Sequence, residues 1–270
     1  MDVRRLVRGT IPWSDLERVA EEIRERYERE AIRIEFLDAD NWLSTPMVVE
    51  DEWFVKLLSP QNARVHALFT GARNLGAFTS GSMTFFEPFE SPYEMARHEL
   101  EATRTMREIG LNAPAPVEAF QVGEFGVVVL EYLPEFRTFT DVSSVTVRNY
   151  SAELFEALAQ MHEHGLVHGD LRSENVLLFE NEIYFIDVTN VSEEGIDDAI
   201  AYDLASALAT LAPIIGTRKV VDDALEYYDI ESLLSARDFL DIVRIRPDHE
   251  FDAGLVKGEI EKRASRLPRR

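Results

Sequence analysis

The sequence predicts an α+β fold in which a strand-rich part with one long helix precedes a mostly helical part. Two observations predict it. Runs of β-branched, aromatic and leucine residues, which are typical of strands, cluster before residue 60 and recur near residue 128. From residue 150 onward, apolar residues recur mainly at helical spacing, interrupted by one hairpin pattern. The 270 residues suffice for one domain of two lobes or for two small domains.

The composition restricts the cellular compartment. The chain contains no cysteine, which argues against an extracellular protein held by disulfides. We find no apolar run long enough to span a bilayer and no signal-peptide pattern at the N-terminus. We therefore expect a cytoplasmic protein with no membrane contact.

Acidic residues dominate the charge. Asp and Glu number 50 against 28 Lys and Arg, for a formal net charge of -22. Such a surplus is tolerated when salt screens it, so we expect a halophilic source, such as a halophilic archaeon. It also argues against general nucleic-acid binding, which needs a basic face. Residues 262–270 are locally basic, and form either a solvated tail or a contact for RNA or an acidic partner.

Two capped helices are predicted in the first 110 residues. Ser14 opens the first helix, which occupies most of an N-terminal segment, residues 1–30. Ser91 caps the second helix, Glu94 completes its capping box, and Gly110 suits the left-handed position beyond its end. We expect the first helix to pack on the strands that follow it.

Residues 31–58 are predicted to form three antiparallel strands, and a long connection follows them. The turns between these strands fall at residues 38–45 and 50–52. Residues 59–91 then form an unusually long insertion before the second helix. Its first half, residues 65–75, has apolar side chains at helical spacing, and its second half is rich in glycine and phenylalanine. We expect the insertion to act as a lid or a docking surface, and the alternative is an inert segment that packs on itself.

Lys56 is one of only four lysines and lies in an apolar strand that is covered on both faces. A buried ammonium group needs a partner or a phosphate group. Helical spacing places Glu99 on the apolar stripe of the second helix, where a carboxylate also needs a partner. We therefore predict a Lys56–Glu99 ion pair. The alternatives are an edge-strand lysine that prevents aggregation and a glutamate that reaches solvent.

The stretch from residue 166 to residue 190 places four polar side chains around an apolar hairpin. His168, Asp170 and Asn175 precede two short strands separated by the turn-like sequence "ENE", and Asp187 follows them. Because a hairpin brings its ends together, Asp187 should return close to Asp170 and Asn175. Carboxylate and amide oxygens suit a magnesium ion that phosphate oxygens also bind. Asn175 and Asp187 are therefore candidate metal ligands, and Asp170 can orient an attacking hydroxyl group.

The sequences "HGDLRSEN" and "YFIDVTN" resemble the catalytic loop and metal-binding segment of the protein-kinase-like superfamily, and most closely the RIO family of atypical kinases. The resemblance implies a two-lobed protein-kinase-like fold. Its small lobe would comprise residues 31–133, including the insertion, and its large lobe residues 134–270. The implied cofactors are ATP and Mg²⁺.

The resemblance also implies a role for each polar residue of the motif. Asp170 would be the catalytic aspartate, and His168 would support its loop. Asn175 and Asp187 would bind magnesium, and Asp187 can itself receive the phosphoryl group in this family. Asp203 would hydrogen-bond the catalytic loop from below.

The residues that the resemblance implies for ATP binding are Lys56, Glu99, Ser44, Thr45, Glu131 and Leu133. The lysine and glutamate would grip the α- and β-phosphates. The turn where a phosphate loop is expected lacks glycine, so backbone amides and the two hydroxyl groups would hold the phosphates. The backbones of Glu131 and Leu133 would bind adenine, with Leu130 as gatekeeper.

The leading function is that of an ATP- and magnesium-dependent RIO-like serine/threonine kinase or ATPase. No long activation loop separates Asp187 from the next helix, which we expect to be amphipathic with Asp203 near its start, so the sequence offers no evident platform for a peptide. One alternative is a small-molecule phosphotransferase of the aminoglycoside or choline kinase type. Another is a non-catalytic ATP-binding assembly factor, acting on a ribosomal particle as in the RIO family. The phosphoryl acceptor can be a protein or a small molecule.

Overall fold

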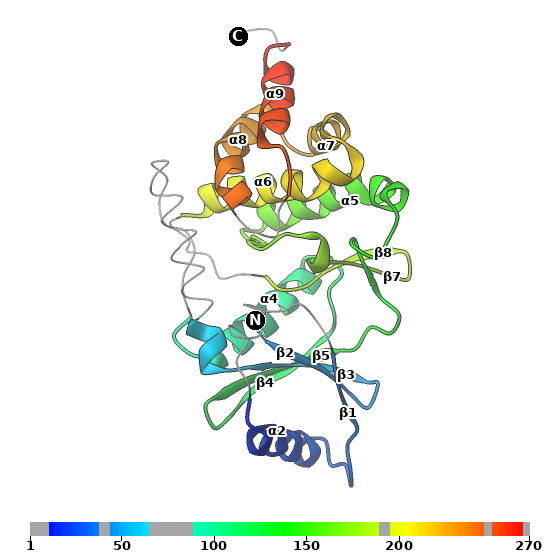
Figure 1. The fold of residues 1–270 in the computed structure, drawn as a ribbon, viewed down its shortest axis with the longest axis vertical. Helices are drawn as coiled ribbons and strands as arrows, with labels where there is room; N and C mark the ends of the chain where they lie inside the picture. Colours follow the sequence, from blue (N-terminus) through cyan, green and yellow to red (C-terminus); the bar gives the residue numbers. More distant parts are fainter. Residues whose placement is uncertain (1–10, 38–43, 65–88, 189–194, 246–249, 267–270) are drawn as a thin grey trace. The chain divides into compact units, whose positions relative to one another are not determined.

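The computed structural model describes residues 11–37, 44–64, 89–188, 195–245 and 250–266, and it confirms the α+β class. The chain forms two compact units. The small unit ends at Pro134 and leaves out residues 106–113, which belong to the large unit. Figure 1 labels most of the described elements. They are α2 (Trp13–Arg26), β1 (Ile34–Phe36), β2 (Thr45–Val49), β3 (Trp53–Leu58), α4 (Pro92–Glu108), β4 (Pro116–Val122), β5 (Phe125–Glu131), β6 (Arg137–Thr138), α5 (Ser144–Glu163), η1 (Ser173–Asn175), β7 (Val176–Phe179), β8 (Glu182–Phe185), α6 (Ile196–Ile215), α7 (Thr217–Ala224), α8 (Ile230–Ile245) and α9 (Ala253–Ala264).

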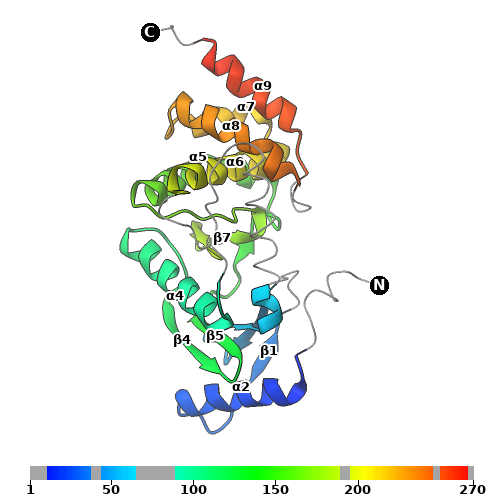
Figure 2. The ribbon, with the colours of Figure 1, turned by 90° about the vertical axis from the view of Figure 1, so that its left-hand side faces the viewer.

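The small unit is an antiparallel sheet in the order β1-β2-β3-β5-β4, with α2 and α4 on opposite faces (Figures 1 and 2). Strand alternation separates two apolar clusters. One cluster, under α2, includes Val19, Ile23 and Val55, and the other, under α4, includes Met95 and Leu100. Both faces of the central strands are therefore buried, which agrees with the predicted double-sided burial of residues 53–58.

Helix α2 starts earlier than predicted. Its N-cap is Pro12, and no side chain caps it. The Pro12 carbonyl already accepts from the amides of Asp15 and Leu16. The prediction that Ser14 caps this helix is therefore wrong, because Ser14 already lies within the first turn. The helix packs on the sheet through Val19 and Ile23, which are one helical turn apart.

Helix α4 begins and ends almost as predicted. The amide of Glu94 donates to the Ser91 hydroxyl at 3.1 Å. The Glu94 carboxylate accepts from the amide of Glu90 at 2.6 Å, one residue before the position that a capping box prescribes. Beyond the helix, Gly110 adopts a φ of 89°, as expected for a left-handed end. These caps fix where the helix presents Glu99.

Helix α6 forms the core of the large unit. It contacts α5, α7, α8 and α9, and every residue from 201 to 212 is buried. The expectation of an amphipathic helix here is wrong, because helices surround it on several sides. Among the described residues, α6 is also long and apolar enough to cross a membrane, which corrects the expectation that no run is. Within the large unit, 78% of its most apolar window is buried, as in the core helix of a globular unit.

The predicted hairpin forms, with a tighter turn than expected. Strands β7 and β8 pair from Val176 opposite Phe185 to Phe179 opposite Glu182. Only Glu180 and Asn181 connect them, and both have positive φ, at 52° and 66°. Two such residues define the type I′ turn, whose twist matches that of a hairpin. Strand β6 adds to the outer side of β7.

The insertion, residues 59–91, and the basic C-terminal segment, residues 262–270, are only partly described. In the insertion, residues 60–64 are helical. The helix predicted at residues 65–75 and the Gly- and Phe-rich part lie outside the described residues. In the basic C-terminal segment, α9 continues to Ala264, where Lys262 and Arg263 pair with Glu259 at 2.9 and 3.0 Å. The first basic residues of this segment are therefore helical and paired.

Candidate functional site

The predicted ion pair is present inside the small unit. Lys56 Nζ lies 2.5 Å from Glu99 Oε1, and the two side chains are 3% and 13% exposed. Strand β3 lies between β2 and β5, so the edge-strand alternative for Lys56 is wrong. A glutamate that escapes to solvent is also excluded, because Glu99 turns inward to the ammonium group. Each charge offsets the desolvation of the other.

The residues predicted to hold the triphosphate are described only in part. Residues 38–43 lie outside the described residues, so the phosphate turn itself is not tested. Ser44, which follows the turn, is 2% exposed, and its hydroxyl has no hydrogen-bond partner among the described residues. Thr45 begins β2 opposite Leu57. A buried hydroxyl without a partner suits a ligand or an ordered water molecule.

Two consecutive amides in the linker at the end of β5 are already bonded within the protein. The Glu131 amide donates to the Ala115 carbonyl at 2.8 Å, and the Glu131 carboxylate accepts from the Ala115 amide at 2.9 Å. The next amide, of Tyr132, donates to the Glu52 carbonyl. Within the described part of the chain, the Leu133 amide has no such partner. An adenine ring could therefore receive a hydrogen bond from Leu133, but not from the amide of Glu131.

In the large unit, His168 is fully buried at the start of the predicted catalytic loop. Its Nδ1 accepts from the Asp170 amide at 3.4 Å, and its ring packs edge-on against Phe185. Burial lowers the pKa of His168 more than the nearby charges of Asp203, Asp170 and Asp187 raise it. The histidine is therefore neutral and supports the loop by packing and one hydrogen bond.

Asp170 and Asn175 contact each other directly. The amide nitrogen of Asn175 donates to the Asp170 carbonyl at 2.8 Å and to Asp170 Oδ2 at 3.3 Å. Arg172 Nε lies 3.5 Å from the same Oδ2. Sequence reasoning missed Arg172, although an arginine two residues after the key aspartate was a visible signal. The loop therefore presents one carboxylate between an amide and a guanidinium group.

Asp187 lies at the exit of the hairpin. The amide of the preceding residue, Ile186, donates to the Asn175 carbonyl at 3.2 Å, so the hairpin ends meet as predicted. Asp187 itself has a φ of 64°. Non-glycine residues in this left-handed region are uncommon and cluster at functional sites.

These side chains fit a magnesium ion shared with a phosphorylated ligand. Within the described ranges, no group of three or more His, Cys, Asp or Glu side chains is placed to hold a metal ion. Magnesium does not need one, because it commonly takes one or two protein oxygens and completes its shell with water and phosphate oxygens. The Asn175 nitrogen faces Asp170, which turns the amide oxygen the other way. That oxygen and the Asp187 carboxylate are hard donors of the kind that magnesium takes.

Asp203 holds the loop from α6. It is fully buried, and its two oxygens accept from the amides of His168 and Gly169 at 2.8 and 3.0 Å. His162 Nε2 lies 3.0 Å from the same carboxylate, and Tyr228 Oη lies 2.8 Å from His162 Nδ1. Sequence reasoning placed Asp203 correctly but missed the two residues behind it. No local pattern marks them.

Comparison with known families gives a partial match. Residues 86–202 match the family model of the RIO domain. The matched stretch contains Glu99, Asp170, Asn175 and Asp187, but it does not reach Lys56 or Asp203.

Three curated proteins illustrate the similarity. The chain is 29% identical to the KEOPS complex subunit Bud32 of Pyrococcus abyssi over 97 residues. This aligned stretch covers 35% of the chain and 43% of Bud32. It is 31% identical over 99 residues to the serine/threonine-protein kinase SMU1 of Mycosarcoma maydis. That alignment covers 34% of the chain and 13% of SMU1. It is 29% identical over 123 residues to the human ribosomal protein S6 kinase alpha-2. That alignment covers 43% of the chain and 17% of the human kinase.

The chain thus spans less than half the length of these curated relatives. The matches to a RIO domain and to kinases support an atypical, kinase-like phosphotransferase. An antiparallel sheet in one unit and mostly helices in the other are consistent with the protein-kinase-like fold that the sequence predicted.

Proposed function

We propose that this chain is an ATP- and magnesium-dependent RIO-like kinase or ATPase that transfers the γ-phosphoryl group. The observation that carries the proposal is the group formed by Asp170, Asn175 and the hairpin exit. There the Asn175 amide donates to the Asp170 carboxylate, and a second carboxylate, that of Asp187, follows the residue whose amide is bonded to Asn175. Such a group suits phosphoryl transfer, in which the protein mainly positions charged groups.

Each residue then has a physical task. Lys56, oriented by Glu99, would bind the α- and β-phosphates, and the Leu133 amide would bind adenine. Asn175 and Asp187 would hold the magnesium ion. The ion would supply positive charge to the phosphate oxygens as negative charge shifts to the leaving group. Asp170 would orient the attacking oxygen and accept its proton.

The route through Asp187 distinguishes an ATPase from a kinase. In the ATPase route, an Asp187 carboxylate oxygen attacks the γ-phosphorus, a new P–O bond forms, and the bond to the β-phosphate oxygen breaks to release ADP. Water then attacks the phosphorus of the acyl phosphate and gives a proton to Asp170, and the bond between the phosphorus and the Asp187 oxygen breaks. This releases inorganic phosphate and restores the Asp187 carboxylate. In the kinase route, a serine or threonine hydroxyl attacks the γ-phosphorus directly and Asp170 takes its proton. The bond to the β-phosphate oxygen breaks, so the products are the phosphorylated acceptor and ADP.

Labelled γ-phosphate separates these routes. With ATP and magnesium, the ATPase route predicts a protein-bound label that hydroxylamine removes, since hydroxylamine cleaves acyl phosphates. The label should be absent in Asp187→Asn and should accumulate in Asp170→Asn, where hydrolysis is slowed. Label that resists hydroxylamine and disappears in Asp170→Asn would instead identify a serine/threonine kinase. Absence of ATP turnover and of label in the wild-type protein, with and without cell extract, would contradict the proposal.

A second candidate function is that of a subunit whose activity depends on a complex. The similar Bud32 protein is named as a subunit of the KEOPS complex. We propose that the present chain also works bound to partner proteins. Its native mass in a lysate of its own source, by size-exclusion chromatography, should then exceed the 30.8 kDa of the chain. Elution at the monomer position would reject this candidate without affecting the catalytic one.

A further inference from the structure

A chain of hydrogen bonds runs from Tyr228 to the catalytic loop inside the large unit. Tyr228 Oη lies 2.8 Å from His162 Nδ1, and His162 Nε2 lies 3.0 Å from Asp203 Oδ2. Asp203 accepts from the amides of His168 and Gly169 at 2.8 and 3.0 Å. Three segments that are distant in sequence, α5, α6 and the loop after α7, therefore meet behind the loop that carries Asp170.

The hydroxyl proton of Tyr228 sets the direction of each bond when the His162 ring is neutral. Burial raises the pKa of Tyr228, and the charges of Asp203 and Glu163 raise it further, so the hydroxyl keeps its proton. A protonated hydroxyl can donate to His162 Nδ1. A neutral imidazole that accepts at Nδ1 carries its hydrogen on Nε2, which faces Asp203. Tyr228 thus selects the ring form of His162 that can donate to Asp203.

The loop needs this support. Gly169 has a φ of 73°, a left-handed conformation immediately before Asp170. Asp203 bonds the two amides that lead into that bend, those of His168 and Gly169. A carboxylate that loses one of its donors inside a protein becomes less well held, because the charge has lost part of its compensation. A change at Tyr228 should therefore reach the backbone that orients Asp170.

We propose that Tyr228 is a positioning residue for phosphoryl transfer, acting through His162 and Asp203 on the backbone of the catalytic loop. It does not contact the reacting groups. Its effect on turnover rests on the proposed function, whereas its effect on the loop does not. The two effects can therefore be measured separately.

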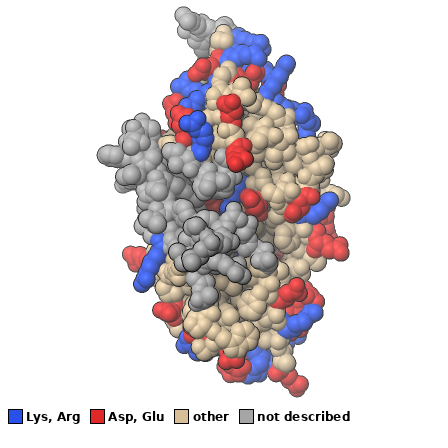
Figure 3. All heavy atoms as spheres, in the orientation of Figure 1, with Lys and Arg blue, Asp and Glu red and all other residues tan. Residues whose placement is uncertain are grey.

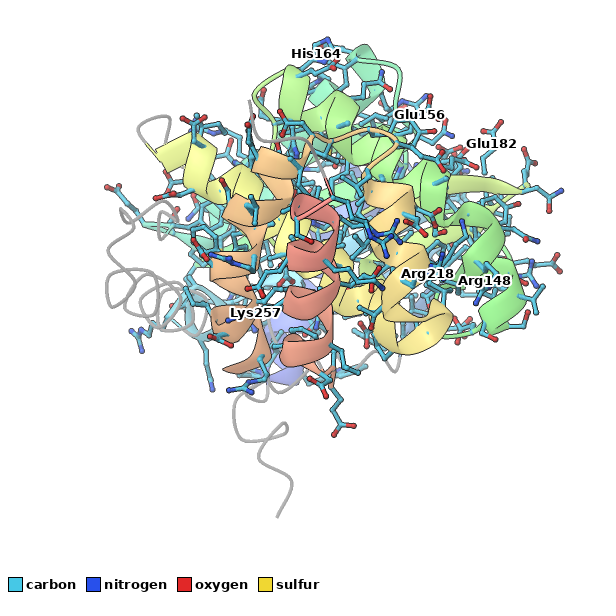
Figure 4. All side chains as sticks on the ribbon, turned by 90° about the horizontal axis from the view of Figure 1, so that it is seen from above. Arg148, Glu156, His164, Glu182, Arg218 and Lys257 are labelled. Carbon is cyan, nitrogen blue, oxygen red and sulfur yellow. The ribbon has the colours of Figure 1, made fainter. Side chains whose placement is uncertain are left out.

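Tyr228→Phe removes the hydroxyl and keeps the ring, which lies edge-on to His162 with centroids 5.8 Å apart. Turnover of ATP should fall about tenfold in kcat, as expected when a buried hydrogen bond that orients the loop is lost. KM for ATP should stay the same, since the Lys56–Glu99 pair is untouched. Tyr227→Phe is the matched control, because Tyr227 is 37% exposed and its hydroxyl lies 3.4 Å from Glu156, labelled on α5 in Figure 4. It should leave kcat and KM unchanged.

A double-mutant cycle tests whether the effect passes through His162. His162→Phe breaks the link to Asp203, so adding Tyr228→Phe to it should cost no further activity. Multiplicative losses from the two substitutions would show that Tyr228 acts by another route and would overturn the proposal. Equal loss of activity in Tyr227→Phe and Tyr228→Phe would also overturn it.

Amide hydrogen exchange supplies a readout that needs no activity. The amides of His168 and Gly169 should exchange faster in Tyr228→Phe than in the wild type, while Tyr227→Phe behaves as the wild type. Imidazole nitrogen shifts should show the Nε2–H form of His162 in the wild type. Unchanged exchange at both amides would reject the proposal. If the wild-type protein turns over no ATP, the proposed function fails, and the exchange data still decide the role of Tyr228.

Discussion

The ammonium group of Lys56 and the carboxylate of Glu99 lie 2.5 Å apart, although 43 residues separate them in the sequence. One is contributed by a central strand and the other by the helix on the face of the sheet. Both are almost fully buried, so each depends on the other for compensation of its charge.

Lys56→Met should abolish ATP turnover and weaken ATP binding, because the cation proposed to bind the phosphates is lost. Stability should fall by about 3 kcal/mol, since Glu99 is left as a poorly compensated charge. The matched control is Lys257→Met: Lys257 projects from α9 (Figure 4) and bonds Asp241 at 2.6 Å on the surface. It should change stability by less than about 1 kcal/mol. ATP titration calorimetry and urea unfolding measure both effects, and unchanged ATPase activity in Lys56→Met would remove Lys56 from the site.

Gly126 in β5 should tolerate no side chain. A Cβ atom there would lie 2.0 Å from the Pro92 carbonyl oxygen at the start of α4, which is backbone and cannot move aside cheaply. Gly126→Ala should therefore destabilise the fold by about 3 kcal/mol or more, as in other overpacked sites. Gly258→Ala is the control, because nothing lies within 4 Å of its Cβ position in α9. It should stabilise by up to about 1 kcal/mol through helix propensity. Similar urea midpoints for the two variants would contradict the close approach of α4 to β5.

His168 should make stability depend on pH. Burial lowers its pKa in the folded state, so between that pKa and about 6.5 only the unfolded chain binds the proton. The stability due to the neutral, buried ring is then present at neutral pH and lost as the pH falls below about 6.5. His168→Asn keeps an acceptor for the Asp170 amide but cannot titrate. The stability difference between wild type and variant should shrink from pH 7.5 to pH 5.5 in urea unfolding, and a constant difference would show that the pKa is not lowered.

The net charge of -22 should make the fold dependent on salt. Figure 3 shows acidic and basic side chains interspersed on the face in view. Surface pairs such as Arg26–Glu22 do form, but the surplus of acid still repels itself. Between about 0.01 M and molar salt the Debye length falls from ~30 to ~3 Å. The thermal midpoint should rise by about 5 °C or more over this range, and less in sucrose, which is excluded from the surface without screening charge. A midpoint that does not change with salt would reject the proposal of a halophilic source.

Local patterns were sufficient for much of the candidate site. The apolar run around Lys56, the stripe that includes Glu99 and the hairpin before Asp187 each lie within one or two elements, where spacing sets which side chains face the core or meet. The approach of Asp187 to Asn175 follows from hairpin pairing alone. Local patterns misled at Ser14, because Pro12 already supplies the first helical carbonyl, and at α6, because periodicity does not show how many neighbours surround a helix.

The sequence by itself thus determined the fold class and the site residues that local spacing reveals, such as Lys56, Glu99 and Asp187. Only the tertiary structure decided which side chains support the catalytic loop by hydrogen bonds from the helices that pack against it. Tyr228 and His162 are 66 residues apart, and neither belongs to a motif. Their contact exists because α5, α6 and the loop after α7 pack together, which buries Asp203 fully and His162 and Tyr228 in part, so that these polar side chains bond one another. Such pairings depend on how helices pack in three dimensions, and no spacing along the chain encodes them.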